Sequence, residues 1–485
     1  MKVILNNKHL SHQSHHSFAQ SGFSSLLFVV LVGMSLTALS VGYLSTTRSM
    51  QSSAITVHAQ TQAQMNAMVG VQAVSRFLKT MNQNELNKTV KGKVTDSSGE
   101  IVNTYTKVAA CTLENQYCYD IEGKSGGATS IIRAQYNFAK EIKPQSVAGT
   151  IFAGGLVVGG SATFKGEEGD DVTIFVGGSN AGKVTNTAGK EVALDHIDVQ
   201  EFNGNLEVAT ATMLRSSANY IFTRNSAGAI ACFRNNLNVS GTNITVETAI
   251  TCPSQGVTLN SGIWTFDSSK ANLAGVIWFD GDVKLQLNST PSDYVNSVLA
   301  VGSVTTELSK GNSAGAYNIY APLHYLLTAT NSQIKSRLEK VCPQDNYPIQ
   351  YCKPYSLSDR NLLTSIDFFY NNRDKYLNNI DAFPANLANI LFLTDASFAI
   401  DAANKTEMNL FGNILGTQGA GGTGKASGKI TGTGNINIKG NLVVTGTLTT
   451  EVQGNMTITL GKSNSSGNNI PSIKSVLKAG AIRYM

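Results

Sequence analysis

The chain has 485 residues, of which 42% are apolar and only 14% are charged. The apolar share excludes a disordered chain, which needs low hydrophobicity and high charge, and the length allows more than one domain. The formal net charge of +5 is too small to indicate a nucleic-acid-binding protein by itself. With 45 glycines, 9 prolines and few charges, the composition is more typical of an exported β-protein than of a cytosolic enzyme.

The first 80 residues are the most informative part of the sequence. Residues 1–22 are polar and weakly basic, and residues 23–44 form an almost uncharged apolar run. At about 1.5 Å per residue, a helix of 22 residues spans the roughly 30 Å hydrocarbon core of a bilayer. The run is longer than the apolar region of a secretory signal peptide, and no A-x-A cleavage site follows it. We therefore expect a spanning helix with its basic flank in the cytoplasm and the rest of the chain exported.

The same helix is predicted to continue to residue 80. Residues 45–80 contain no proline and are rich in Ala, Gln and Met. Apolar residues recur there at three- and four-residue spacings, and Val57 and Thr61 extend the pattern toward the membrane. This stripe consists of Met65, Met68, Val71, Val74 and Leu78. It predicts that residues 23–80 form one helix, apolar in its first half and packed against a partner surface in its second half.

The segment Ser21-Gly22-Phe23 resembles the class III signal of type IV pilins and of the pseudopilins of type II secretion. In this sequence a hydrophilic, basic leader ends in glycine and is followed at once by phenylalanine and the apolar run. The resemblance implies that a prepilin peptidase cuts between Gly22 and Phe23 and that the new amino group of Phe23 is methylated. The segment Thr46–Met50 and the Gln/Ala-rich helix after it further resemble the PilX-type minor pilins.

Leu27 departs from the family pattern, because the fifth residue after the cut is normally a glutamate. The glutamate would pair with the N-terminal amine of a neighbouring subunit inside the apolar bundle, where an unpaired charge is costly. Its absence favours a rare or terminal subunit over a repeating one. An ordinary single-span anchor for a surface domain is the alternative interpretation.

The pilin interpretation also implies partners and a location. The partners are other pilin subunits, which contact the N-terminal helix, and prepilin peptidase. The chain would cross the bacterial inner membrane once, with its body in the periplasm. After assembly the body would reach the cell surface or the tip of a pilus.

The exported body is predicted to be mainly β. A connecting α+β region, residues 81–148, precedes β-rich regions at residues 149–330 and 385–485. A glycine followed by Asn or Asp and then by alternating apolar residues recurs, as at Gly281-Asp282-Val283 and Gly440-Asn441-Leu442. Such corners, which lead from a tight turn into a strand, favour a β-solenoid of the parallel β-helix type. A β-sandwich is the alternative, because it gives many of the same local signals.

One stretch, residues 331–384, has helical periodicity instead. Ser356 or Ser358 is a candidate N-cap for its second helix, and four prolines bracket or separate the helices. We predict an inserted helical subdomain that docks against the β body.

All six cysteines follow the apolar run and form sequence-local pairs. An even count in an exported chain indicates disulfides, and pairing of nearest neighbours is the simplest arrangement. Each bond would stabilise the fold by about 2–4 kcal/mol. The predicted pairs are Cys111 with Cys118, Cys232 with Cys252, and Cys342 with Cys352. A metal site is not predicted, because no pair is C-x-x-C and only His196 and His324 lie in the body.

Three further segments carry weak signals. Residues 419–425 (GAGGTGK) match the start of a phosphate-binding loop, but Ala426 replaces the hydroxyl residue and no helix pattern follows. Asp195, His196 and Asp198 alternate with apolar residues as on a strand, and nothing marks a nucleophile. An acidic turn, which could take calcium although its spacing matches no known loop, contains Glu167, Glu168, Asp170 and Asp171. We predict no catalytic, cofactor-binding or metal-ligating residue, and calcium is the one ion that we consider.

These features predict a minor or tip pilin-like subunit of a type IV pilus or a related filament, and not an enzyme. Its β-rich domain would serve assembly initiation or adhesion, with a surface glycan or a host molecule as candidate ligand. The alternative is a membrane-anchored β-solenoid enzyme or binding protein that acts on polysaccharide. Loss of Lys2 and Lys8 with the leader lowers the formal charge from +5 to +3, so we expect no nucleic-acid partner.

Overall fold

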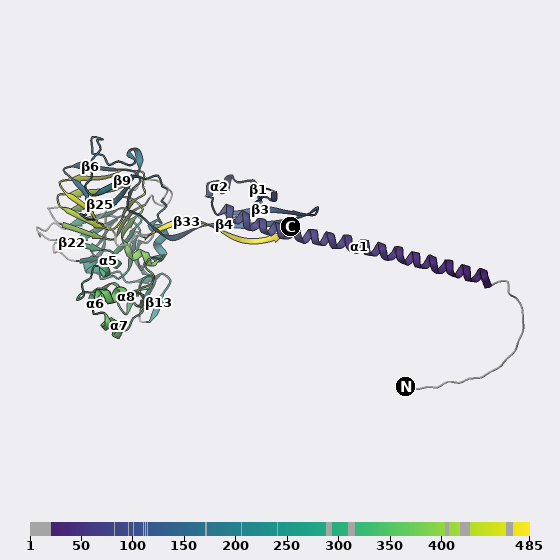
Figure 1. Ribbon diagram of the computed structural model, residues 1–485. Coiled ribbons are helices and arrows are strands. Elements are labelled where there is room, and N and C mark those ends of the chain that lie inside the picture. The colour runs from purple at the N-terminus through teal and green to yellow at the C-terminus, as the bar shows by residue number, and fades with distance from the viewer. Residues whose placement is uncertain are drawn as a thin grey trace, which may run out of the picture. The chain divides into compact units, whose positions relative to one another are not determined.

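The fold of the protein is given by a computed structural model (Figure 1). It describes residues 21–485 except 82, 96, 100, 110, 112, 114, 170–171, 205, 240, 288–292, 309–315, 403–406, 418–426 and 462–468. The chain divides into two compact units. Unit 1 comprises Met1–Ala139 and Ser475–Met485, and unit 2 comprises Lys140–Lys474.

Unit 1 consists of a long helix and a sheet. Helix α1 spans Ser21–Leu78, and the short helix α2 (Gln83–Lys88) follows it. The sheet has the order β1-β2-β3-β4-β33, in which β1 to β4 form an antiparallel meander. Its strands are β1 (Lys91–Thr95), β2 (Ile101–Val108), β3 (Gln116–Ser125), β4 (Ala128–Ser146) and β33 (Asn469–Tyr484). The C-terminal strand completes this sheet, whereas the sequence analysis placed residues 385–485 with the coils of the body.

The C-terminal half of α1 packs on this sheet through small and apolar residues. Gly123 of β3 permits a close approach, because a Cβ added there would overlap the helix backbone at Ala63 and Ala67. Asn103, only 2% exposed, lies at the same contact and donates from Nδ2 to the Asn66 carbonyl oxygen at 2.8 Å. The buried apolar side chains recur every three or four residues and are those of Ala59, Ala63, Ala67, Val71, Val74 and Leu78.

This buried stripe differs from the predicted one in its first half. Val71, Val74 and Leu78 are buried as expected, but Val57 and Met65 are exposed. Next to Gly123 the close approach leaves room only for small side chains, here those of Ala63 and Ala67. The larger apolar side chains therefore lie on the other side.

Unit 2 is built on three long sheets of mainly parallel strands, to which successive coils of the chain each contribute a strand (Figure 1). β17, β18 and β22 pair in parallel with the corresponding strands of the next coil. This arrangement is that of the predicted solenoid, whereas the strands of a β-sandwich pair antiparallel. The prediction of a long N-terminal helix followed by a mainly β body is confirmed.

The strands of the three sheets are listed here in spatial order. The first sheet contains β14 (Thr248–Ile250), β11 (Ile230–Arg234), β10 (Tyr220–Arg224), β17 (Val276–Phe279), β20 (Ser297–Ala300), β24 (Ile390–Thr394), β27 (Asn413–Gly416), β30 (Leu442–Val444), β5 (Thr150–Phe152), β8 (Val172–Val176) and β9 (Ile197–Glu201). The second contains β15 (Val257–Asn260), β16 (Ile263–Phe266), β18 (Val283–Leu287), β21 (Val304–Leu308), β25 (Phe398–Ala402), β28 (Gly428–Gly432), β31 (Thr450–Gly454) and β6 (Leu156–Gly160). The third contains β19 (Asp293–Val295), β22 (Ala316–Tyr320), β26 (Glu407–Phe411), β29 (Asn435–Lys439), β32 (Thr457–Gly461) and β7 (Thr163–Gly166).

The spatial order of the coils differs from their order along the chain. β30, β31 and β32 of the last complete coil pair in parallel with β5, β6 and β7 of the first. β8 and β9 extend the first sheet beyond β5, and β10 then begins the opposite end of the stack by pairing with β17. The two ends of the body's sequence therefore hold each other in register within the solenoid.

Glycines form corners where the chain passes from one sheet to the next. Gly440 and Gly454 have φ angles of +155° and +135°, a region that favours glycine. A Cβ added at Gly440 would overlap the backbone of Gly412, and one at Gly454 the backbone of Gly432. Both the backbone conformation and the stacking of neighbouring coils therefore require glycine at these two Gly-Asn corners.

Apolar side chains fill the interior of the solenoid. Trp264 is fully buried, and its ring lies 6.1 Å from that of Phe222 and 5.6 Å from that of Phe279. Its Nε1 donates to Asp280 Oδ1 at 2.8 Å, so the indole N–H is also satisfied. Trp278 is 5% exposed and packs in a second cluster beneath the helical insertion.

Between β22 and β24 the chain leaves the solenoid and forms short helices. Ser356, one of two candidate caps, is the N-cap of the third of them, because its Oγ accepts from the Asp359 backbone N–H at 3.0 Å. The insertion contains α5 (Pro322–Leu327), α6 (Ile334–Val341), α7 (Leu357–Leu362), α8 (Ile366–Asn371), η3 (Arg373–Lys375) and η4 (Ala385–Asn389). Its strand β23 (Asn346–Pro348) joins β12 (Leu237–Val239) and β13 (Thr242–Ile244) in a small sheet. Other short helices of unit 2 are η1 (Gly178–Asn180), α3 (Ala211–Leu214), η2 (Arg215–Ser217) and α4 (Ser268–Ala271).

Three disulfides join the cysteines in nearest-neighbour pairs. The bonds are Cys111–Cys118, Cys232–Cys252 and Cys342–Cys352. The third closes the loop between α6 and α7 that carries β23.

We expect Gly123→Val to loosen α1 from β3. A valine side chain overlaps the helix backbone, so the helix or the strand must shift, at a cost of about 1–3 kcal/mol. Hydrogen exchange of the β3 amides, measured on the full chain in detergent, should become faster. The control is Lys124→Val, because the adjacent Lys124 side chain is 68% exposed. Unchanged protection of β3 in Gly123→Val would contradict the close packing.

Candidate functional site

The N-terminal half of α1 is not covered by any other part of the described chain. Its large apolar side chains, from Leu26 to Leu44, are between 39% and 74% exposed. Among the described residues, α1 is the one helix that is long and apolar enough to cross a membrane. This half of the helix is therefore a surface that requires either lipid or other helices around it.

The polar side chains in this apolar region satisfy their own hydrogen-bonding needs. Ser35 Oγ donates to the Leu31 carbonyl oxygen at 2.8 Å, and Ser40 Oγ donates to that of Leu36 at 2.7 Å. Thr37 makes the same kind of bond to Gly33. Because a bilayer offers no water to an unpaired hydroxyl, this pattern makes the helix compatible with a hydrocarbon environment.

The second half of α1 continues the exposed apolar surface on the side away from the sheet. Met65 and Val69 are 59% and 60% exposed and lie one turn apart, on the side of the helix opposite Ala67. Val57, 60% exposed, lies two turns before Met65. We call the exposed apolar residues of α1 from Leu26 to Val69 the free surface of the helix.

The predicted processing positions, Gly22 and Phe23, lie at the start of α1. Residues 1–20 of the predicted leader lie outside the described residues. Leu27 is 55% exposed and belongs to the free surface of the helix.

A second region of interest is a cleft of about 800 Å³ in unit 2. α4 and the loop after it form one wall, and α6, α7 and the loop between them form the other. Its charged residues are Lys335, Glu339, Lys340 and Arg360. Arg360 Nη1 donates to Glu339 Oε2 at 2.5 Å, which ties α7 to α6.

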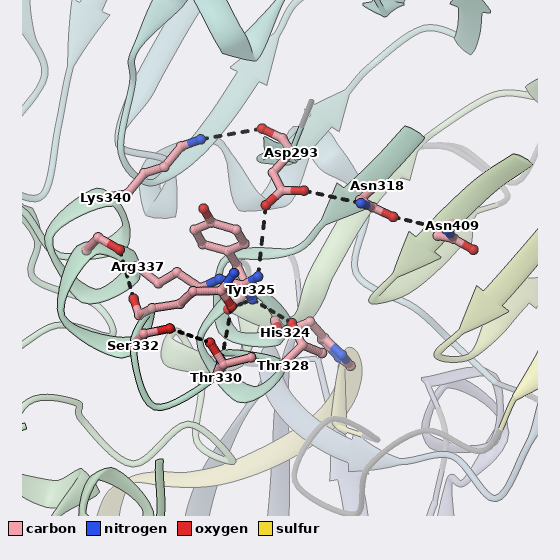
Figure 2. Close-up of polar contacts among 12 residues, drawn as sticks. Asp293, Asn318, His324, Tyr325, Thr328, Thr330, Ser332, Arg337, Lys340 and Asn409 are labelled. Atoms are coloured by element: carbon pink, nitrogen blue, oxygen red, sulfur yellow. Dashed lines mark hydrogen bonds and ion pairs between the residues drawn. The ribbon is translucent and has the colours of Figure 1, made fainter. Parts of the chain in front are cut away.

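Arg337 holds α6 beside this cleft (Figure 2). It is 6% exposed, and its Nη1 donates to the Tyr325 carbonyl oxygen at 2.7 Å and to Thr328 Oγ1 at 2.9 Å. The guanidinium also lies 4.3 Å from the centroid of the Tyr325 ring and 3.9 Å from Asp293 Oδ2. Because its donors are used within the protein, Arg337 is a structural residue that fixes α6 on α5 and β19.

An amide ladder runs from Asp293 across the outer face of the third sheet (Figure 2). Asn318 donates to Asp293 at 3.3 Å, Asn409 donates to Asn318 at 3.0 Å, and Asn437 donates to Asn409 at 2.7 Å. The four residues come from neighbouring strands in register. The side chains satisfy one another, so the ladder stabilises the stacking of the coils.

Buried amides tie the loop between α6 and α7 to the solenoid. Asn219 Nδ2 donates to Gln350 Oε1 at 2.7 Å, while Asn219 Oδ1 accepts from the Val276 backbone N–H at 2.8 Å. Asn346 Nδ2 donates to Tyr220 Oη at 3.0 Å. Together with the Cys342–Cys352 disulfide, these bonds fix one wall of the cleft.

His324 of α5 is a buried titratable group in the same region. It is 3% exposed, and its Nε2 has no hydrogen-bond partner among the described residues. Burial lowers the pKa of His324 from its ordinary value of 6.5 to about 4, so the ring is neutral at pH 7.

The other sequence-predicted sites do not form a catalytic arrangement among the described residues. His196 lies 3.6 Å from the carboxylate of Asp195, with both side chains about half exposed or more. Glu167 of the acidic turn pairs with Lys439 at 3.0 Å, whereas Asp170 and Asp171 lie outside the described residues, as does GAGGTGK at 419–425. No group of three or more metal-ligating side chains occurs in the described part of the chain.

Sequence reasoning missed the residues of the cleft. They come from segments between Ser268 and Asn361 that share no motif and meet only in the folded chain. The basic residues on α6, in the segment Ile334–Val341, were the one available signal.

A comparison with solved structures finds chains that are similar to this one. No family model matches this chain, and neither does any curated protein. The competence-associated pilin ComZ from Thermus thermophilus is similar over 88% of this chain and 97% of that chain, with 10% sequence identity and a TM-score of 0.22. A TM-score this low does not establish a common fold.

We predict that the body loses stability as the pH falls from about 6.5 to 4, in part because of His324. In that window the folded form binds fewer protons than the unfolded form, so the free energy of unfolding decreases as the pH falls. The contribution of neutral His324 to stability is therefore complete above pH 6.5 and is lost by pH 4. It amounts to about 3 kcal/mol. Denaturant unfolding at several pH values should show a weaker pH dependence in His324→Leu. The control is His196→Gln, which removes an exposed histidine. A His324→Leu profile parallel to that of the wild type would refute this assignment.

Proposed function

We propose that this chain is a pilin-like subunit of a type IV pilus or a related filament. The observation that carries the proposal is the division of α1 into a stripe buried on its own sheet and a free surface on the other side. A helix that only anchors a domain needs an apolar surface inside the bilayer. Here the apolar surface continues to Met65 and Val69, beside the segment that packs on the sheet. Such an extension suits packing against the helices of other subunits.

The start of α1 supplies the second support for the proposal. A prepilin peptidase would cut after Gly22, and the methylated amine of Phe23 would become the N-terminus of the helix. The subunit would first cross the inner membrane once, with the residues that follow the apolar run outside the cytoplasm. The disulfides suit that oxidising compartment.

Two features favour a minor subunit at or near the tip over a repeating one. Leu27 offers no charge to pair with the N-terminal amine of a neighbour. Unit 2, residues 140–474, is also a large body to repeat along a thin filament. We therefore assign the chain a role in assembly initiation and in display of the solenoid for adhesion, without catalytic activity of its own.

A second candidate function is binding of polysaccharide by a membrane-anchored solenoid that enters no filament. The cleft of unit 2 is the observation in its favour. The two functions differ in what they require of α1, because an anchor needs neither cleavage after Gly22 nor the apolar surface around Met65.

The processing site gives a direct test. We expect Gly22→Leu to retain residues 1–22 and to be absent from sheared surface filaments, because the peptidase requires glycine before the cut. Intact-protein mass spectrometry and immunoblots of the filament fraction measure both outcomes. Gly33→Leu is the matched control for maturation, since it adds the same side chain to the same helix away from the cut. Normal maturation and filament recovery of Gly22→Leu would contradict the pilin assignment.

A further inference from the structure

We propose that the cleft between α4, α6 and α7 binds a carboxylated saccharide, that is, a sugar unit with both hydroxyl groups and a carboxylate. This proposal deepens the display role and rests on it only for its biological setting. Binding in solution can succeed or fail whether or not the chain enters a filament.

The size and lining of the cleft suit a small polar ligand. Its volume of about 800 Å³ lies within the range of about 300–1,000 Å³ that ligand pockets occupy. Apolar residues such as Leu273 and Val341 line it together with amide, hydroxyl and charged side chains. A sugar ring presents the same mixture of C–H faces and hydroxyl edges.

The lining of the cleft holds more basic than acidic side chains, with Lys335, Lys340 and Arg360 against Glu339. Glu339 is already paired with Arg360 at 2.5 Å. Among the described residues, no carboxylate forms an ion pair with Lys335 or Lys340, although Lys340 Nζ contacts the Asp293 carbonyl oxygen at 3.4 Å. The cleft therefore favours a ligand that carries an anionic group.

Three other residues of the lining hold oxygens whose hydrogen-bonding capacity the protein does not use. Ser268 Oγ, Asn346 Oδ1 and Tyr351 Oη are buried and have no partner among the described residues. Tyr351 is only 1% exposed, and burial raises the pKa of its phenol, which therefore stays protonated. An unpaired buried oxygen is costly, so a ligand group that reaches one of these oxygens would gain a hydrogen bond that the protein does not make.

These oxygens distinguish a saccharide from a simple anion. Asn346 Oδ1 can only accept a hydrogen bond, and a phosphate diester or a carboxylate has no proton to donate to it. Sugar hydroxyls both donate and accept. A ligand that satisfies both the lysines and Asn346 must therefore combine an anionic group with hydrogen-bond donors, and the hydroxyls of a sugar acid supply them.

The lining also disfavours single-stranded nucleic acid. Such ligands gain affinity by stacking bases on exposed aromatic rings, at about 1–3 kcal/mol per base. Tyr351 is the one aromatic residue among the described residues that line the cleft, and its ring is buried. Stacking is therefore not available.

The test titrates the purified full chain in detergent with a trisaccharide of galacturonic acid and measures binding by calorimetry. We expect saturable binding that weakens at least tenfold when the carboxylates of the trisaccharide are reduced to alcohols. Binding should also weaken at least tenfold in the double variant Lys335→Gln/Lys340→Gln. Lys429→Gln, which removes an exposed lysine from β28 outside the cleft, should bind as the wild type does.

Tyr351→Phe separates a ligand contact from a structural role. Because the phenol oxygen has no protein partner, its removal should leave the thermal unfolding temperature unchanged or higher while it weakens binding. A fall in that temperature would show that the oxygen is a structural group and would contradict its role as a ligand contact.

Three outcomes would overturn the proposal. One is the absence of saturable binding to the trisaccharide by wild-type protein. Another is equal affinity for the reduced, neutral trisaccharide. The third is binding of a single-stranded oligonucleotide with the same affinity and the same loss in the double variant, which would make the cleft a general polyanion site.

Discussion

The contact between Gly123 and the backbone of α1 is the constraint on which the rest of unit 1 depends. The absence of a side chain at Gly123 lets the helix approach β3 so closely that only alanine fits at positions 63 and 67. That choice fixes the rotation of the helix about its axis. Met65 and Val69 are consequently directed away from the sheet and belong to the free surface of the helix.

The sequence of unit 1 is interrupted by that of unit 2, yet α1 still packs on β3. β4 and β33 are neighbours in the sheet of unit 1, yet unit 2 occupies the sequence between residues 140 and 474. Unit 2 is thus an insertion between two adjacent strands. Its own first and last complete coils are paired through β5 with β30, β6 with β31, and β7 with β32, so the insertion closes on itself. The helical insertion likewise interrupts the solenoid, between β22 and β24. Its helices α6 and α7 form one wall of the cleft.

The sequence predicted the kinds of element well, because local chemistry decides them. The recurring Gly-Asn and Gly-Asp corners indicated a solenoid, and glycines such as Gly440 are indeed required where coils stack. The order of the coils was not predicted from the sequence. Each coil has a similar pattern of apolar residues, and no local signal places β5 beside β30. The buried side of α1 was predicted wrongly at Met65, because the prediction followed the spacing of large apolar residues. In the structure the facing residue, Gly123, leaves room only for small side chains on the helix. The cleft was missed because Asn346 and Tyr351 are remote in sequence from Ser268 and become its neighbours only through the helical insertion.

The central claim is that the free surface of α1 packs against other subunits. Site-specific photo-crosslinking in cells that make the filament tests this claim most directly. A crosslinking amino acid at position 65 should capture another pilin subunit. The same amino acid at position 64, which is exposed but about 100° around the helix, should capture far less. Crosslinks from position 65 only to lipid, or equal yields from both positions, would contradict the claim and leave α1 as a simple membrane anchor.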